Sequence, residues 1–356
     1  MGNSIPIFYV NAPFKASSHI GHFSQRMRFM SEFSDIDFAF IVQVIFSLLA
    51  IILVYDAISG ERAHGQLRLI LSNSVPRANL LIGKFIGNAL CLLLPFGSCF
   101  VLGLLVVQLS PSVQLTNEDW ARIAIMFGIS ALYLLAFLNL GTLVSCKTRT
   151  PALSLLILLS LWIWLIVVHP KLSVFAAQKF APVESEARMG QQLRQVYEDY
   201  QQKKQKDQKE TGGRYGLLLF IQEAKENKKL YDNFLNEFAQ QARVADWVSK
   251  ASPVGCYDSA MTAVAKTDVA SHDRWLNSVR SFWSVYTAFH EARQQKRLEG
   301  KKQEADEMKK NPPQFVMTPE SLSESLHRAM PGIAMLIFFN IIFFMLSYLF
   351  FLKYEV

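Results

Sequence analysis

A glycine and a lysine at positions 83 and 84 are the residues that first suggest nucleotide chemistry in this sequence. A phosphate-binding loop requires the pattern G-x-x-x-x-G-K-[ST], because its backbone amides surround the phosphates and its hydroxyl group binds Mg²⁺. Here Ala78 stands in place of the first glycine, and Phe85 stands in place of the hydroxyl residue. The sequence therefore predicts no ATP binding through Lys84, which we expect at a membrane interface instead.

The other reactive side chains form no pattern typical of a metal site or a catalytic centre. His19 and His22 lie three positions apart without a third ligand nearby, which favours a solvent-exposed pair over a zinc site. The sequence contains no H-E-x-x-H and no G-x-S-x-G motif, and its 4 cysteines form no C-x-x-C pair. We therefore expect no metal, no cofactor and no catalytic residue in this chain.

Long apolar runs dominate the sequence, in which 51% of the residues are hydrophobic. Each run is close to the ~20 residues that a helix needs to cross the hydrocarbon core of a bilayer. Apart from Asp37 at one edge, the runs carry no Asp, Glu, Lys or Arg. Buried core helices of a soluble domain are a poor explanation for so many runs. We expect an all-α, polytopic membrane bundle with spans at residues 36–54, 85–109, 123–145, 151–168 and 331–352.

The polar side chains within the predicted spans are uncharged amides and hydroxyl groups, and none of them is Asp, Glu, Lys or Arg apart from Asp37 at one edge. A proton-coupled transporter or pump needs ionisable groups within the membrane, and an intramembrane enzyme needs a catalytic constellation that this sequence lacks. Asn139 and Asn340 are typical of residues that form hydrogen bonds between membrane helices. If the chain takes part in transport, the energy must come from a partner.

A hydrophilic segment, residues 170–330, separates the last two runs. Its apolar residues recur with helical period, and from Trp275 to Phe289 they step by four and three, which is typical of a coiled-coil seam. Breakers at 211–213, 252–255 and 311–313 divide the segment, so we expect an all-helical domain with at least three long helices. Basic and acidic residues alternate along it, so the net charge of +7 does not indicate nucleic-acid binding.

Lysine and arginine in the short loops predict the orientation of the bundle. The loop 55–84, the turn 146–150 and the C-terminal tail are basic, which indicates that they are cytoplasmic. Because the N-terminal residues have no apolar core to carry them across, we infer a missing first span; translocation of a short N-terminus by the span that follows is the alternative. The expected parts are an extracytoplasmic segment 1–35, four spans in 36–169, an extracytoplasmic helical domain 170–330, and a final span with its tail in 331–356.

Within the loop 55–84, residues 61–71 predict a short amphipathic helix at the membrane interface. One face of it carries the apolar residues Ala63, Leu67, Ile70 and Leu71. Pro76 follows and prevents the helix from continuing directly into the next span. Such a helix can transmit a displacement that a cytoplasmic motor protein produces to the membrane helices. An interfacial helix without a partner explains the same pattern equally well.

This loop resembles the corresponding region of the permease subunits of type 2 ABC exporters, a class that includes the copper-enzyme maturation permeases. The family pattern is E-x-x-x-G-T-L-x-x-L-L-S-x-P-x-x-R-x-x-x-x-x-G-K, and it is matched here by Glu61, Gly65, Leu67, Leu71, Ser72, Arg77, Gly83 and Lys84. Gln66 departs from the usual threonine, and the spacing around Pro76 is slightly shifted. Residues 140–170 and 251–268 are similar to further parts of the pattern, the latter in members with a large extracytoplasmic insertion.

The resemblance implies six spans per subunit, two permease subunits as a homodimer or heterodimer, and two ATP-binding subunits in a bacterial inner membrane. The loop 55–84 would supply the coupling helix, with ATP and Mg²⁺ held by the ATP-binding partner. The implied contacts to that partner, none of them catalytic, are Glu61, Arg62, Gly65, Arg68 and Arg77. The chain is then the permease of an ATP-driven exporter. The alternative is a non-transporting membrane protein whose external helical domain binds a partner or transmits force.

Overall fold

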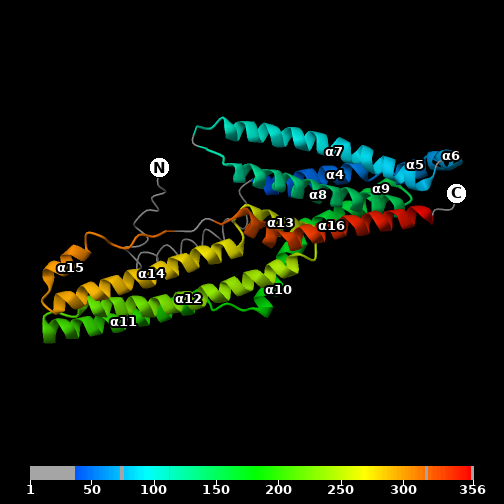
Figure 1. Ribbon diagram of the computed structural model, residues 1–356. Helices are drawn as coiled ribbons and strands as arrows, with labels where there is room; N and C mark the ends of the chain where they lie inside the picture. The colour runs from blue at the N-terminus through cyan, green and yellow to red at the C-terminus, as the bar shows by residue number, and fades with distance from the viewer. Residues whose placement is uncertain (1–36, 73–75, 112, 317–319, 354–356) are drawn as a thin grey trace. The chain divides into compact units, whose positions relative to one another are not determined.

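The structure is a computed structural model that describes residues 37–72, 76–111, 113–316 and 320–353 (Figure 1). The predictions for the N-terminal segment 1–35, including those for His19 and His22, lie outside these residues. The described part is built from helices and contains no strand.

The described residues form two compact units. The first, which we call the membrane unit, contains residues 38–181, 240–274 and 320–353, and the second, the insertion unit, contains residues 182–239 and 275–316. The hydrophilic segment expected as one helical domain is therefore divided, because its residues 240–274 cluster with the membrane-spanning helices.

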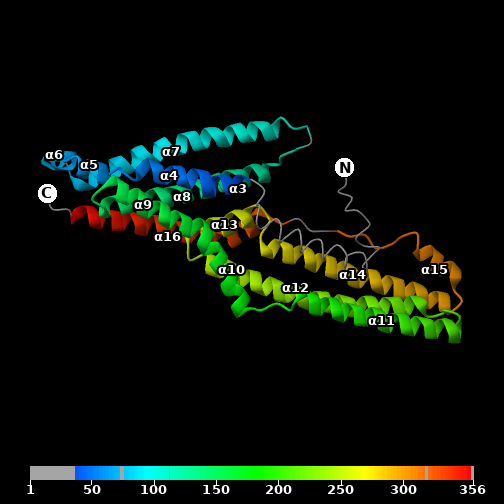
Figure 2. The ribbon, with the colours of Figure 1, turned by 180° about the vertical axis from the view of Figure 1, so that it is seen from behind.

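Five helices of the membrane unit are long and apolar enough to cross a bilayer. This confirms the prediction of an all-α polytopic membrane protein. The first and fourth of these helices each contain a π-helical stretch, so they consist of several labelled pieces (Figures 1 and 2). The pieces are α3 (Phe38–Phe40), η1 (Ile41–Phe46) and α4 (Ser47–Val54); α7 (Arg77–Gln108); α8 (Asn117–Lys147); α9 (Pro151–Ile163), η2 (Trp164–Val168) and α10 (His169–Phe180); and α16 (Leu322–Leu352).

Local capping, rather than the end of the apolar sequence, decides where two of these helices begin. At the start of α8, the Thr116 hydroxyl accepts from the backbone N–H of Asp119, whose carboxylate accepts from the backbone N–H of Thr116. Ser321 and Glu324 form the same reciprocal pair before α16. Such a capping box satisfies N–H groups that have no partner within the helix. Both helices are consequently longer than the apolar runs, and Pro331 lies inside α16.

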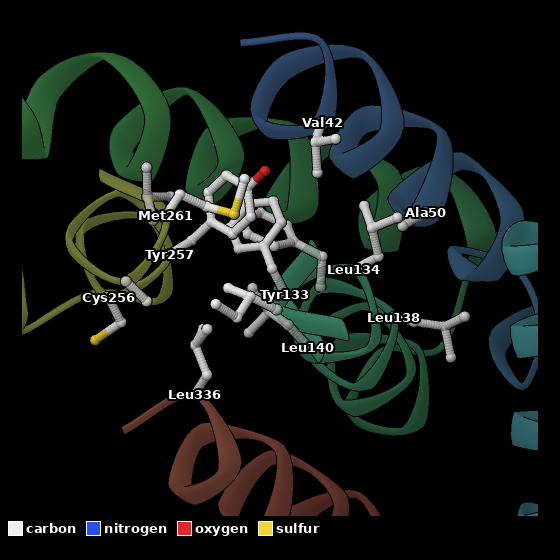
Figure 3. Packing of buried hydrophobic residues seen from close by; sticks show 14 of the residues in the cluster. Val42, Ala50, Tyr133, Leu134, Leu138, Leu140, Cys256, Tyr257, Met261 and Leu336 are labelled. Atoms are coloured by element: carbon white, nitrogen blue, oxygen red, sulfur yellow. The ribbon is translucent and has the colours of Figure 1, made fainter. Parts of the chain in front are cut away.

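The core of the membrane unit surrounds α8. Tyr133, Leu134 and Phe137 of α8 are fully buried and pack with residues of α4, α16 and the short helix α13 (Pro253–Val264). Figure 3 shows Tyr133 and Leu134 in this cluster. Gly141 allows α8 and α4 to approach closely, because a Cβ atom added there would lie 2.3 Å from Cγ2 of Val54. Small residues permit this kind of contact between membrane helices.

Two asparagines link α8 to α16 within the bundle. The Asn139 side-chain amide donates to Oδ1 of Asn340 at 2.9 Å, and the Asn340 amide donates to the carbonyl oxygen of Leu132 at 3.0 Å. The prediction that these residues form interhelical hydrogen bonds is confirmed. The NH₂ groups of both side chains thereby find acceptors that lipid could not supply.

The helix α13 comes from the hydrophilic segment but is buried among the spans. The Ser252 hydroxyl accepts from the Gly255 backbone N–H and starts the helix where the breaker 252–255 was predicted. A Cβ atom at Gly255 would lie 2.1 Å from the Ser249 carbonyl oxygen, and one at Gly332 of α16 would lie 2.7 Å from the Cys256 carbonyl oxygen. Glycine at both positions lets α13 pack closely against its neighbours.

The insertion unit consists of long helices, as predicted. They are α11 (Glu186–Thr211), the first part of α12 (Gly216–Ser249), most of α14 (Val269–Leu298) and the short α15 (Lys302–Met308). Gly212 ends α11 with a φ of 68°, a left-handed conformation that favours glycine. Asp232 of α12 and Arg280 of α14 form an ion pair at 2.7 Å, which joins these two helices.

One acidic residue of the insertion unit, Glu223, is buried, and the nearby charge of Lys204 only partly offsets the effect of this burial on its pKa. Glu223 is 3% exposed, and burial raises the pKa of its carboxyl group from 4.5 to about 7 despite a hydrogen bond with Asn227. The ionised form of Glu223 is therefore less favourable in the folded state than in the unfolded state, in which the carboxyl group ionises at its ordinary, lower pKa. Stability falls as the pH rises from the unfolded to the folded pKa, by up to about 3 kcal/mol.

Replacing Glu223 with glutamine is accordingly expected to raise the melting temperature of the insertion unit at pH 8, and to have a smaller effect as the pH approaches 5. Thermal unfolding of the whole chain at both pH values measures this difference. Glu198→Gln, at an exposed position on α11 of the same unit, is the matched control and should change neither melt. Destabilisation by Glu223→Gln at pH 8 would contradict the assignment.

Candidate functional site

The loop 55–84, which we call the elbow, contains two short helices in place of the single helix predicted over 61–71. They are α5 (Ser59–Ala63) and α6 (Gln66–Ser72), and they lie at the same end of the membrane unit as the end of α16 (Figures 1 and 2). Gly65 separates them with a φ of 72°, and its N–H donates to the Arg62 carbonyl oxygen. The prediction was wrong at this point, because glycine readily adopts the left-handed conformation that terminates a helix.

Ser145, near the end of α8, anchors the start of α5. Its hydroxyl oxygen lies 3.1 Å from the backbone N–H groups of both Ile58 and Ser59, and it is fully buried. These are N–H groups at the N-terminus of a helix, which lack partners within that helix. Ser145 gives no local signal in the sequence, because its partners lie 86 and 87 positions away.

Charged side chains of the elbow attach it further to the bundle. Lys84 forms an ion pair with Glu61 at 2.6 Å and donates to the Ala57 carbonyl oxygen at 2.7 Å. Arg62 donates to the Thr148 carbonyl oxygen at 3.0 Å. Lys84 therefore holds the elbow to the beginning of α7, a role consistent with its failure to match a phosphate-binding loop.

The second short helix, α6, has one anchored and one exposed side. Leu67 is fully buried in a small cluster with Ile58, Leu81, Cys146 and Phe351. Arg68 is exposed, and Leu69 is 70% exposed. Of the residues predicted on the apolar face, Leu67 faces inward, whereas Ala63 is exposed because the break at Gly65 changes the direction of the chain.

The candidate coupling residues thus have three different roles in the structure. Glu61 and Arg62 bind the elbow to the bundle, and Arg77 donates to the Leu352 carbonyl oxygen at the end of α16 at 2.8 Å. Gly65 sets the break between α5 and α6, with open space around it. Arg68 is the member of the predicted set that presents an exposed charge on α6.

Polar links also cross the interior of the membrane unit beside its two π-helical stretches. The Trp162 indole, just before η2, donates to the Ser47 hydroxyl at 2.8 Å, and Ser47, just after η1, donates to the Gln43 carbonyl oxygen. The Tyr133 hydroxyl donates to the same carbonyl oxygen at 3.2 Å. Widened helical turns expose carbonyl groups to such partners and are frequent at functional sites.

At the opposite end of α8 from the elbow, Arg122 lies in a buried polar network. Arg122 is 6% exposed, and its guanidinium donates to the carbonyl oxygens of Val264 and Glu320 at 2.9 and 3.3 Å. It also donates to the Ser325 hydroxyl and the Glu118 carboxylate at 3.0 and 2.7 Å. One side chain thereby joins α8, α13 and the start of α16.

Arg328 extends this network through Glu320. It forms ion pairs with both Glu320 and Asp268, and the Ser325 hydroxyl donates to the Glu320 carboxylate at 2.6 Å. Burial alone would raise the pKa of Glu320, but the hydrogen bonds from Ser325 and Arg328 and the charge of Arg328 outweigh it and lower this pKa below its ordinary value. Glu320 is therefore ionised at neutral pH.

The comparison with known families is decisive for the class of the chain. The model of the ABC-2 family transporter proteins matches residues 10–356. The chain belongs to this family. As an ABC-2 family member with five membrane-length helices, it is a multi-pass permease component of the ABC transporter type.

Two curated relatives of this ABC-2 permease are described as probable ABC transporter permease protein NosY. One, from Stutzerimonas stutzeri, is 32% identical over 143 residues, which cover 38% of this chain and 50% of the relative. The other, from Pseudomonas aeruginosa, is 42% identical over 71 residues, which cover 19% of this chain and 25% of the relative. The chain thus spans half the length of these relatives or less.

The residues of the ABC-2 permease that the structure describes contain no group of three or more His, Cys, Asp and Glu side chains suited to a metal ion. Of its cysteines, Cys91 and Cys99 are exposed on α7, whereas Cys146 and Cys256 are buried. Burial raises the pKa of the Cys256 thiol to about 12, so this thiol is protonated and unreactive.

Proposed function

We propose that this chain is the membrane-spanning permease of an ATP-driven exporter, and that the elbow couples it to an ATP-binding subunit. The observation that carries the proposal is the construction of the elbow. A short helix, α6, presents Arg68 and Leu69 outward, while Ser145, Lys84 and Arg62 hold the chain around α5 to the bundle. An element that is exposed on one side and attached on the other can transmit a displacement.

The attachment points suggest where a displacement of α6 would go. Ser145 and Thr148 belong to the end of α8, and Lys84 belongs to α7. A push on α6 therefore reaches two spans through short polar contacts rather than through a flexible loop. The core around α8 and the links between α8 and α16 would carry it across the bundle.

The proposed assembly contains two permease subunits and two ATP-binding subunits in a bacterial inner membrane. ATP and Mg²⁺ would be bound by the ATP-binding subunits, and none of the elbow residues would take part in hydrolysis. The relatives described as ABC transporter permeases support this assignment by similarity over part of their length.

A second function is favoured by the size of the insertion unit. Its long helices, joined by the Asp232–Arg280 and Lys225–Glu291 ion pairs, suit partner binding or the transmission of force as well as substrate handling. In that case, ATP hydrolysis by the partner would change the conformation of the insertion without moving a substrate.

Inverted membrane vesicles containing the whole complex distinguish the two functions. The vesicles are incubated with a cell extract and either ATP or a non-hydrolysable analogue, and the accumulated compounds are compared by mass spectrometry. Export predicts at least one compound that accumulates with ATP alone and is lost in Arg68→Glu. ATP hydrolysis without accumulation of any compound would overturn export in favour of force transmission.

A further inference from the structure

The fourth membrane-length helix is longer than a bilayer requires. It runs from Pro151 to Phe180 and has 30 residues, which at 1.5 Å per residue gives roughly 45 Å. The hydrocarbon core is about 30 Å thick. About a third of the helix therefore lies outside the core. Because Pro151 follows directly on the turn beside the elbow, the part of the helix that lies outside the hydrocarbon core is at its C-terminal end, in α10.

α10 does not simply prolong the span. η2 lies directly before α10, Pro170 is the second residue of α10, and Figures 1 and 2 show α10 turning away from the direction of α9. At its far end, the Gln241 side-chain amide donates to the Ala181 carbonyl oxygen at 2.9 Å. α10 is thus inclined to α9, and contacts at both of its ends hold it in this direction.

The two sides of α10 differ in character. His169, Ser173 and Ala177, which recur every four residues, are buried against the membrane unit. The outer side exposes Val174 and Phe175, at 51% and 66%. Lys171 and Lys179, also exposed, lie four residues before and after Phe175, so they flank it on the same face.

The exposed apolar side of α10 continues that of the span before it. Leu156, Ile163 and Val167 of the preceding pieces are 64%, 50% and 45% exposed, as expected for side chains that face lipid. Phe175 follows them with a lysine on each side. An aromatic ring suits the headgroup boundary, and lysine can bury its aliphatic stem there while its ammonium group reaches a lipid phosphate.

We propose that α10 lies in the headgroup region of the leaflet on the side of the insertion. Phe175 enters the upper acyl region, and Lys171 and Lys179 bind lipid phosphates. The lipid surface fits better than a protein partner, because the apolar surface is continuous with that of a membrane-spanning helix and its charges alternate with the apolar residues. The basic pair makes the contact stronger with anionic lipid.

Spin labels in the full chain test this proposal. Cys91→Ala and Cys99→Ala remove the exposed thiols, and single labels are placed at Phe175→Cys, at Leu156→Cys as the lipid reference and at Tyr197→Cys, an exposed site on α11, as the water reference. The chain is reconstituted in vesicles of phosphatidylethanolamine and phosphatidylglycerol. Collision rates with oxygen, which concentrates in lipid, and with a water-soluble nickel chelate are then measured.

We expect the oxygen-to-nickel collision ratio at position 175 to exceed that at position 197 several-fold and to lie below that at 156. Lys171→Gln with Lys179→Gln, or phosphatidylcholine in place of phosphatidylglycerol, should lower the ratio at position 175 and leave that at 156 unchanged. A ratio equal to that at 197 would show that α10 lies in water. Shielding from both reagents would show a protein partner or a second copy there, and either result would overturn the proposal.

Discussion

Replacement of Arg122 by leucine is expected to destabilise the chain by about 3–5 kcal/mol, the usual effect of removing one member of a buried charged network. The guanidinium is almost completely buried and satisfies the carbonyl oxygens of Val264 and Glu320. Leucine fills part of the volume but donates no hydrogen bond, so these carbonyl groups lose their donor in a buried site.

The loss of Arg122 should act on several elements at once. Its contacts fix the end of α13 and the segment before α16 to α8, and all three helices contribute residues to the core of the membrane unit. A thiol-reactive fluorophore measures the effect in a Cys91→Ala, Cys99→Ala background, because the remaining buried Cys146 and Cys256 react when the core opens. The labelling temperature, at which these two buried thiols become reactive, should be several degrees lower in Arg122→Leu.

Arg188→Leu is the matched control for this experiment. Its side chain is 73% exposed and pairs with Glu184 at 3.7 Å four residues away, an interaction that contributes less than about 1 kcal/mol. A labelling temperature unchanged in Arg122→Leu would mean that the polar network at this end of α8 does not stabilise the core.

Charge reversal of Arg68 is expected to weaken binding to the ATP-binding subunit by about 2 kcal/mol, a roughly thirtyfold loss in affinity. Arginine is frequent among the residues that dominate interface energies, and Arg68 is exposed on α6 beside Leu69. Since Arg68 is exposed in the chain itself, Arg68→Glu should leave folding unchanged. Affinity between the purified subunits, measured by surface-immobilised binding, checks the expected loss.

Glu61→Gln provides an informative contrast to Arg68→Glu. Glu61 pairs with Lys84 and so belongs to the attachment of the elbow. This variant should retain most of the affinity for the ATP-binding subunit but reduce the stimulation of ATP hydrolysis, because the elbow is less firmly joined to α7. If Arg68→Glu binds as tightly as the unchanged chain, α6 does not form the coupling contact.

The membrane spans and their links could be predicted from the sequence because their signals are local. Uncharged runs of sufficient length identify the spans. Polar side chains inside the bilayer, such as Asn139 and Asn340, must form hydrogen bonds with other groups of the protein, because lipid chains offer none. The insertion helices follow from their apolar period and from breakers such as Gly212. Each of these inferences uses a few neighbouring residues and needs no knowledge of the tertiary structure.

The anchoring of the elbow could not be predicted in the same way. Ser145 and Thr148 are ordinary residues at the end of a span, and only the fold brings them to α5. The break at Gly65 was available in the sequence, but the periodic apolar residues on both sides of it favoured a single helix. Burial of α13 depends on close contacts at Gly255 and Gly332, which sequence patterns do not reveal.

A photo-crosslinking amino acid at position 69 tests the central claim most directly. Leu69 is 70% exposed on α6, so the crosslinker is placed on the surface proposed to meet the ATP-binding subunit. The proposed coupling predicts a covalent product with that subunit in membranes, and none from the same crosslinker at position 197 of the insertion unit. Crosslinking of position 69 to lipid alone, in membranes that contain the assembled complex, would contradict it.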